Sequence, residues 1–446
     1  MKSTSGVRGI VGSGLDPLLA TTYGAAFGTF LKKGKVVVGR DTRPSGDMLV
    51  RSVVAGLASV GIDVVDIGVV PTPTVEIAVK KLRAAGGICV TASHNPAPWN
   101  ALKFFNNHGE FITPSQYKEL DYLVNCGRFA YKPVAKLGRI SEQDHWVEYH
   151  IEKTLAQKAV NKPAIKRRKF KVVVDATNGA GSVALPMLLE KMGVKVVRLY
   201  CEGDGKFVHE PEPIPKNLTQ LGRMVRHHKA DLGLACDPDA DRLALVNEKG
   251  KPIGEELTLA IAVKEVLKKR RGNTVINLST SSVTADAARE AGSKVYYSKV
   301  GEANVVQMMK QRKAVIGGEG NGGVIYPAFH AGRDSLIAAA LVLSCLATEK
   351  LTLSELVATF TEYFTIKSKA ALPDNFPGKL EQLEAKAVEL LGKTRVDRKD
   401  GLRFDFAEGW LQLRSSNTEP IYRLIVETRS RKLSNDLYHT VQKHFR

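Results

Sequence analysis

Two short segments of this sequence carry side chains that could do chemistry together. Residues 91–96 place Ser93 next to His94, and a serine beside an imidazole is a candidate nucleophile for phosphoryl or acyl transfer. The preceding apolar run, 87–90, reads as a buried strand, and α/β proteins bind ligands at the carboxyl ends of strands. Taken alone, the segment is more typical of a turn than of a catalytic site, because Ser, Asn and Pro favour turns.

The second segment places Asp237, Asp239 and Asp241 at alternate positions after another apolar run. In an extended loop, this spacing directs three carboxylates at one cation, and an all-oxygen ligand set favours Mg²⁺ or Ca²⁺. A calcium EF-hand is excluded, because its sixth loop position needs a glycine and Arg242 stands there. A solvated acidic turn is the remaining alternative. We favour a metal site with room for a phosphate oxygen.

Other polar groups could bind a phosphate or move a proton. Residues 414–418 combine a guanidinium, hydroxyls and backbone N–H groups, which makes either a phosphate cradle or a polar hairpin. Lys103 is a candidate general acid–base if burial lowers its pKa, although exposed lysines are commoner. Arg8 lies between glycines and could reach a phosphate. Glu319, in the glycine-rich loop 317–323, could hydrogen-bond sugar hydroxyls.

The elements that must position these groups form a threefold internal repeat. Each unit has an apolar strand, a helical stretch, a second strand after a glycine, and a third apolar run with a polar loop at its end. The first strands begin at residues 35, 171 and 273, and the second strands follow Gly61, Gly193 and Gly292. This alternating order predicts largely parallel, helix-covered sheets.

From about Lys367 the repeat is lost. Residues 403–406, 410–413 and 422–426 read as short antiparallel strands, and 433–445 as a closing helix. We therefore expect an α/β protein with three tandem related α/β domains of mixed, helix-covered sheets and a C-terminal α+β domain, arranged around a central cleft. The expected domains are residues 1–140, 141–250, 251–362 and 363–446.

Composition narrows the class of protein and its partners. The 446 residues are 43% apolar and 25% charged, without the roughly 18 apolar residues in a row that a membrane helix needs. The N-terminus has no apolar signal-peptide core, and the five cysteines are scattered, so we expect a cytoplasmic protein without a zinc site. The net charge of +19 suggests nucleic acid, but the longest basic run, 166–169, is short. Spread positive charge instead favours small dianionic substrates.

Together these segments resemble the α-D-phosphohexomutase family. The resemblance covers the whole chain in order and rests on residues 6–9, 91–96, 237–242, 318–323 and 414–420. It implies a four-domain architecture. It also implies an isomerase that moves a phosphoryl group between C6 and C1 of a hexose phosphate, through a phosphoserine and a bisphosphate intermediate. A hexose 1,6-bisphosphate would be the activator, and the enzyme would be a monomer or homodimer that binds neither nucleic acid nor membrane.

The resemblance also implies roles for single residues. Ser93 would be the phosphoserine and would bind Mg²⁺ together with the three aspartates. Lys103 and His94 would accept or donate the proton of the attacking or leaving hydroxyl. Arg8 would lie near the phosphoserine, and Arg242 would lower the barrier to phosphoryl transfer. The implied substrate contacts are Glu302, Glu319, Asn321, Arg414, Ser416, Asn417 and Thr418.

The choice of sugar rests on smaller differences. Loop 319–323 reads Glu-Gly-Asn-Gly-Gly, whereas members acting on mannose and glucose phosphates often carry Glu-x-Ser-Gly-His. The sequence is most similar to the archaeal-type branch usually assigned as phosphoglucosamine mutases, so we expect conversion of glucosamine 6-phosphate to glucosamine 1-phosphate. An acidic pair, Glu302 and Glu319, could favour the ammonium of an amino sugar. The alternative is a phosphomannomutase/phosphoglucomutase, and the remote alternatives are a non-catalytic sugar-phosphate-binding protein or a phosphatase.

Overall fold

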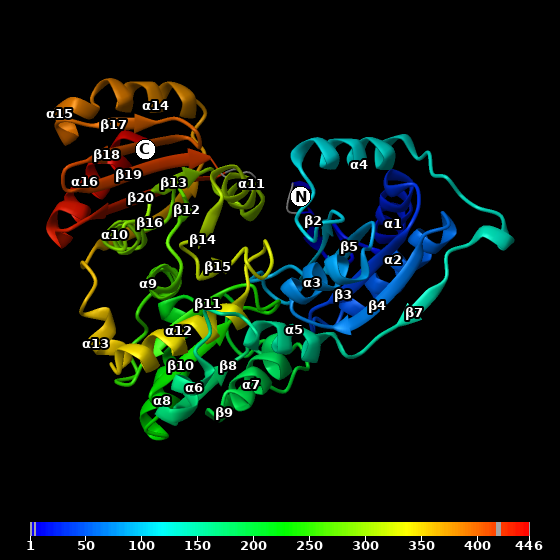
Figure 1. Cartoon of the computed structure of the whole chain (residues 1–446). Coiled ribbons are helices and arrows are strands. Elements are labelled where there is room, and N and C mark those ends of the chain that lie inside the picture. The colour runs from blue at the N-terminus through cyan, green and yellow to red at the C-terminus, as the bar shows by residue number, and fades with distance from the viewer. Residues whose placement is uncertain (1, 4–5, 416–420, 446) are drawn as a thin grey trace.

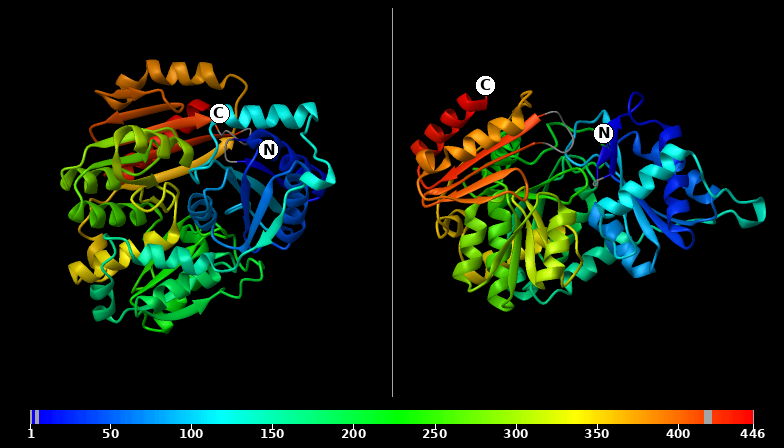
Figure 2. Two further views of the ribbon diagram at one scale, coloured as in Figure 1. Left: turned by 45° about the vertical axis from the view of Figure 1, so that its right-hand side comes forward. Right: turned by 90° about the horizontal axis from the view of Figure 1, so that it is seen from above.

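The computed structural model describes residues 2–3, 6–415 and 421–445 and contains four sheets in chain order (Figure 1). Three are mixed sheets covered by helices, and the last is antiparallel, so the predicted fold class is confirmed. Among the described residues, no helix is long and apolar enough to cross a membrane. In the right-hand view of Figure 2 the N-terminal and C-terminal units lie on opposite sides, with the two middle units between them.

The first unit has a seven-stranded sheet in the order β1-β2-β6-β5-β3-β4-β7. Its strands are β1 (Lys2–Ser3), β2 (Gly6–Ile10), β3 (Lys35–Arg40), β4 (Asp63–Val69), β5 (Gly86–Val90), β6 (Trp99–Phe105) and β7 (Ile140–Glu142). Its helices are α1 (Pro17–Leu31), α2 (Gly46–Ser59), α3 (Thr72–Leu82), α4 (Pro114–Cys126) and the 3₁₀ turn η1 (Val134–Lys136).

The two middle units each have four strands, in the orders β11-β10-β8-β9 and β13-β12-β14-β15. The second unit comprises α5 (Trp146–Leu155), α6 (Lys162–Arg168), β8 (Lys171–Asp175), α7 (Gly181–Lys191), β9 (Lys195–Leu199), η2 (Pro215–Asn217), α8 (Thr219–His227), β10 (Leu232–Cys236) and β11 (Leu243–Asn247). The third comprises α9 (Glu256–Lys269), β12 (Asn273–Asn277), α10 (Ser282–Glu290), β13 (Val295–Ser298), α11 (Glu302–Arg312), β14 (Ala314–Glu319), β15 (Gly323–Ile325), α12 (Ser335–Glu349) and α13 (Leu353–Val357).

The threefold repeat is visible in the strand order. In each of the three units the first strand lies between the second and third, all parallel: β4-β3-β5, β9-β8-β10 and β13-β12-β14. The next strand then pairs antiparallel with the third, as β6, β11 and β15 do. The loops that carry the candidate site residues therefore occupy equivalent positions, between the third strand and its antiparallel neighbour.

The fourth unit has the strand order β16-β20-β19-β18-β17 and is antiparallel throughout. Its elements are β16 (Phe364–Ala371), α14 (Phe376–Ala385), α15 (Ala387–Leu391), β17 (Arg395–Asp397), β18 (Leu402–Phe406), β19 (Gly409–Ser415), β20 (Ile421–Thr428) and α16 (Arg431–Phe445). The three strands and the closing helix expected from the sequence are present, whereas β16 and β17 were missed. The domain bounds expected from the sequence stay a prediction.

The second and third units share one hydrophobic core. A single cluster of buried side chains extends from Ile151 to Leu356. Helix α12 lies within it, and its residues are buried from Ser335 to Ala347, as expected for a helix that is apolar on all sides. The fourth unit has its own cluster. It meets the third unit through polar contacts that include Ser279–Gln412, Ser282–Glu427 and Val300–Asp400.

Candidate active site

Ser93 lies at the start of the loop after β5, as the sequence predicts. It is 3% exposed, and its backbone is left-handed, with φ at +50°. Left-handed backbone is costly for a residue with a side chain and persists where surrounding contacts impose it. One such contact is local, because the Ser93 amide donates to the Thr91 hydroxyl at 2.9 Å. The candidate nucleophile is thus held in a fixed and strained turn.

A buried arginine holds this loop from the outside. Arg43, 1% exposed, pairs through Nε with Asp41 Oδ2 at 3.0 Å, and the Thr91 hydroxyl donates to the same oxygen at 2.6 Å. The remaining guanidinium nitrogens donate at 2.6–2.9 Å to the carbonyl oxygens of Ser93, Asn95, Pro96 and Trp99. Sequence reasoning missed Arg43. The only available signal was its place in the polar loop after the strand that opens the first repeat.

The three aspartates lie together, as predicted, in the loop after β10. Asp237, Asp239 and Asp241 are at most 1% exposed, and each offers an oxygen within 4.8 Å of the others. The loop turns at Ala240, whose φ is +52°. Burial and the two neighbouring carboxylates raise the pKa of Asp237 well above its usual range. Three like charges so close together require compensation by cations.

The nucleophile loop and the acidic loop meet directly. The Ser93 hydroxyl donates to Asp237 Oδ2 at 2.8 Å. Close by, Thr72 at the start of α3 donates its amide to the Asp239 carbonyl at 2.9 Å and its hydroxyl to Asp239 Oδ2 at 2.5 Å. Two segments 144 residues apart in the chain therefore form one site.

Lys103 points from β6 into the acidic cluster. Its Nζ lies 2.5 Å from Asp239 Oδ2 and 3.6 Å from Asp241 Oδ2, and the residue is 2% exposed. The sequence makes Lys103 a candidate general acid–base only if burial lowers its pKa, and this arrangement does not meet that condition. Burial does act in that direction, but the two carboxylates outweigh it and raise the pKa of Lys103 above its usual value. Lys103 is an ammonium here.

The donor set fits a hard divalent cation. Asp239 Oδ1 and Asp241 Oδ1 are buried and have no hydrogen-bond partner among the described residues. Lys103 and Asp239 pair through Oδ2, which leaves the second oxygen of that carboxylate free. Carboxylate oxygens without donors are the ligands that Mg²⁺ prefers. Asp239 and Asp241 can therefore accept an ion without breaking a bond to Oδ1, whereas Asp237 Oδ1 already accepts the amides of Asp241 and Arg242.

The other predicted catalytic residues surround Ser93. His94 Nδ1 lies 3.3 Å from the Ser93 hydroxyl, and burial together with the guanidiniums of Arg242 and Arg8 holds the pKa of His94 well below its usual range. Arg8 Nη1 donates to Asn95 Oδ1 at 2.5 Å. Arg242 Nε lies 3.8 Å from both Asp237 Oδ2 and Asp241 Oδ1. His94 is therefore a neutral imidazole at pH 7.

The glycine-rich loop brings Glu319 to the same region. Its Oε1 accepts hydrogen bonds from Asn277 Nδ2 at 2.7 Å and the Gly301 amide at 2.8 Å, whereas Oε2 pairs with Arg333. Glu302, at the start of α11, also pairs with Arg333. Burial and the nearby Glu76 raise the pKa of Glu302 to about 8 against the opposing effect of Arg333. Sequence reasoning missed Arg333.

The structure describes two of the remaining predicted substrate contacts, Asn321 and Arg414. Asn321 Oδ1 accepts the Gly323 amide at 3.2 Å, which stabilises the turn of the glycine-rich loop. Arg414 is half-buried in β19, where it is paired in register with Arg423 of β20. Ser416, Asn417 and Thr418 lie outside the described residues, so the phosphate-binding role of that loop stays a prediction.

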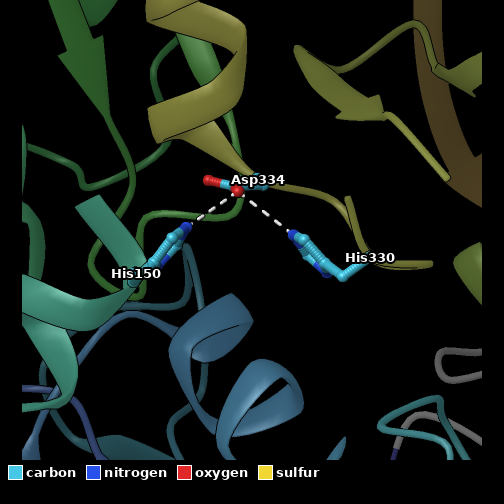
Figure 3. A group of neighbouring side chains, drawn as sticks. All are labelled: His150, His330 and Asp334. Atoms are coloured by element: carbon cyan, nitrogen blue, oxygen red, sulfur yellow. Dashed lines mark hydrogen bonds and ion pairs between the residues drawn. The ribbon is translucent and has the colours of Figure 1, made fainter. Parts of the chain in front are cut away.

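A second buried cluster lies beside the site (Figure 3). The rings of His150 and His330 both point at Asp334 Oδ2, with Nε2 distances of 2.9 and 3.1 Å. His330 Nδ1 also lies 3.2 Å from Glu76 Oε2, and His150 Nδ1 lies 2.8 Å from the Thr74 hydroxyl. Burial lowers the pKa of His330, but the two carboxylates outweigh it and raise this pKa to about 9. The cluster joins helix α3 to the segment before α12.

Family models of phosphoglucomutase/phosphomannomutase match most of the chain, in order. The models of α/β/α domains I, II and III match residues 1–129, 148–250 and 254–363, and that of the C-terminal domain matches 368–443. The chain belongs to the α-D-phosphohexomutase family. This phosphohexomutase is an isomerase, either a phosphoglucosamine mutase or a phosphomannomutase/phosphoglucomutase.

Individual relatives agree with this assignment. A "Probable phosphoglucosamine mutase" of Methanopyrus kandleri is 36% identical over 437 residues, which cover 97% of this chain and 95% of the relative. A "Phosphoglucomutase/phosphomannomutase" of Thermococcus kodakarensis is 36% identical over 442 residues, with the same coverage. The crystal structure of a phosphoglucomutase/phosphomannomutase family protein from Burkholderia thailandensis has a TM-score of 0.87 at 29% identity, covering 100% and 97% of the two chains.

The buried clamp of Arg43 on the nucleophile loop predicts a large cost of its removal. Arg43→Met leaves Asp41 buried without its cation, and we expect the free energy of unfolding to fall by about 3–5 kcal/mol. Urea unfolding followed by circular dichroism measures it. The matched control is Arg51→Met, which removes an exposed i,i+4 pair with Asp47 and should cost about 0–1 kcal/mol. Equally small losses of unfolding free energy in the two variants would contradict the role of Arg43 as a clamp on this loop.

The raised pKa of His330 predicts a pH dependence of stability. The folded pKa of about 9 exceeds the ordinary value of 6.5, so the protonated ring stabilises the fold below pH 6.5, and this stabilisation is lost as the pH rises through 9. We expect the stability difference between the natural protein and His330→Gln to shrink by about 3 kcal/mol from pH 6 to pH 9.5. Urea titrations at both pH values measure it. A constant difference would refute the prediction.

Proposed function

We propose that this phosphohexomutase interconverts glucosamine 6-phosphate and glucosamine 1-phosphate through a Ser93 phosphoenzyme. One observation carries the choice of nucleophile. The Ser93 hydroxyl lies 2.8 Å from Asp237, the first of three buried aspartates. A serine oxygen beside a cation site is where a phosphoryl group can be bound and neutralised at once.

In the proposed reaction, phosphorylated Ser93 donates its phosphoryl group to the free hydroxyl of the sugar monophosphate. The bond from phosphorus to Ser93 Oγ breaks, and a bond from phosphorus to the sugar oxygen forms, giving a bisphosphate. The sugar hydroxyl proton passes to the unprotonated imidazole of His94, and from there to the departing Ser93 Oγ, which lies 3.3 Å from His94 Nδ1. The bisphosphate then reverses its orientation and returns its other phosphoryl group to Ser93.

The cations of the chain supply much of the charge stabilisation. Lys103, kept as an ammonium by Asp239, and Arg242 place positive charge beside the serine oxygen. Arg8 adds a third cation near the loop. Mg²⁺ held by the three aspartates and the phosphoserine would act as a Lewis acid on the phosphoryl oxygens. Phosphoryl transfer depends mainly on such positioning and charge stabilisation.

The choice of glucosamine rests on the loop sequence and on the names of relatives. The phosphoglucosamine mutase relative and the phosphoglucomutase/phosphomannomutase relative are equally identical to this chain, so the latter activity is the alternative. The acidic pair Glu302 and Glu319 is bonded to Arg333. An amino sugar's ammonium would therefore have to share these carboxylates with the guanidinium. A hexose 1,6-bisphosphate activator, a cytoplasmic location and a monomer or homodimer complete the proposal.

Replacement of the nucleophile tests the phosphoenzyme. Ser93→Ala should reduce turnover by about 10³-fold or more, because no covalent intermediate can form. Mutase turnover is measured by coupled assay at saturating Mg²⁺. The control is Ser13→Ala, an exposed serine of the same unit, which should keep full activity. Retained activity in Ser93→Ala would refute the mechanism.

The substrate is tested by ³¹P NMR with Mg²⁺, a catalytic amount of sugar bisphosphate, and the competing 1-phosphates of glucosamine, glucose and mannose. We expect the 6-phosphate of glucosamine to appear first. Earlier conversion of glucose or mannose phosphate would leave the mechanism intact and overturn the substrate. Release of inorganic phosphate alone would indicate a phosphatase, and no change would indicate a binding protein.

A further inference from the structure

We propose that Arg333 is a positioning residue that couples the metal-ligand candidate Asp241 to Glu319 of the glycine-rich loop. The inference rests on the proposed metal-dependent phosphoryl transfer. It concerns a residue that neither touches Ser93 nor belongs to a motif of the sequence. Its three guanidinium nitrogens meet three carboxylates from three different segments of the chain.

Each of the three guanidinium nitrogens of Arg333 contacts a carboxylate in a different segment of the chain. Nη2 lies 2.6 Å from Asp241 Oδ2 in the acidic loop, Nη1 lies 3.0 Å from Glu319 Oε2 at the end of β14, and Nε lies 2.9 Å from Glu302 Oε2 at the start of α11. Arg333 is 8% exposed, so little water screens these pairs. The planar fork of an arginine fixes the relative positions of its partners, which the single ammonium of a lysine cannot do.

The fork leaves Asp241 oriented toward a cation. Arg333 engages Oδ2, whereas Oδ1 is buried without a hydrogen-bond partner among the described residues. Lys103 makes the equivalent contact with Asp239: its Nζ lies 2.5 Å from Oδ2, and Oδ1 has no hydrogen-bond partner among the described residues. Two cations, one from the first unit and one from the third, thus hold one oxygen of each carboxylate and leave the other without a hydrogen bond, although Arg242 Nε lies 3.8 Å from Asp241 Oδ1. Such outer contacts tune metal affinity.

Two independent features fix Arg333 in this position. The next residue, Asp334, caps α12 by accepting the amides of Leu336 and Ile337, and it is held by the two histidines of Figure 3. On the other side, Gly323 makes room for the arginine stem. A Cβ at that position would lie 2.3 Å from Arg333 Cδ. The last glycine of the loop is therefore explained by the path of Arg333.

The coupling follows from the shared guanidinium. Glu319 moves if a sugar hydroxyl donates a hydrogen bond to its Oε2 in place of Arg333. The guanidinium of Arg333 then moves as well, and with it the carboxylate of Asp241. The sugar loop and the metal site then respond to each other. A residue that only balanced buried charge would stabilise the fold without transmitting such a change.

Mn²⁺ binding to the purified enzyme, measured by isothermal titration calorimetry, tests the positioning role. Arg333→Lys keeps the charge but loses the fork, and we expect a Kd for Mn²⁺ about 10-fold or more above that of the natural protein, with a lower kcat. Gly323→Ala, which displaces the arginine without changing charge, should weaken binding in the same direction. Arg51→Met is the control and should bind as the natural protein does.

A double-mutant cycle tests the coupling. Glu319→Gln should weaken Mn²⁺ binding by about threefold or more when Arg333 is present, and should have no effect in an Arg333→Met background. Additive effects would overturn the coupling. Natural affinity in Arg333→Lys, with only a loss of thermal stability, would overturn the positioning role and leave the proposed function intact. Absence of Mn²⁺ binding by the natural protein would instead refute the metal-dependent function itself.

Discussion

The burial of three carboxylates within 4.8 Å of one another is the constraint on which the arrangement of this enzyme depends. Their mutual repulsion in a dry site must be offset by cations, and the acidic loop supplies only Arg242. Lys103 comes from the first sheet, and Arg333 comes from the segment before α12. The three cations come together only when three units are docked, so the site and the assembly of the units depend on each other.

Much of the fold could be predicted because the signals are local. Each third strand is an apolar run that ends in a polar loop, and three repeats of this pattern reveal equivalent strands. The loops that carry Ser93 and Asp237 were found for that reason. Strand β16 was missed because it is a half-exposed edge strand rich in lysine and alanine, without the apolar run that marks a buried strand.

The arginines that hold the site could not be predicted, because their partners are distant in the chain. Arg43 binds carbonyl oxygens 50 to 56 residues away, and Arg333 binds a carboxylate 92 residues away. No spacing in the sequence indicates such a contact. The raised pKa of Lys103 could not be predicted for the same reason, since burial can be inferred from a pattern but the two neighbouring aspartates cannot. The sequence predicts the reacting groups, and the structure shows which arginines contact the segments that carry them.

The second and third units share one hydrophobic cluster, so the units of this enzyme should not all unfold at the same temperature. These two units must melt together, because their buried side chains belong to one core. The fourth unit has a separate core and meets the third through polar contacts. A calorimetric trace of this chain should therefore be broad or stepwise, and no single melting temperature describes it. Warming would detach the C-terminal unit while the acidic loop still holds its shape.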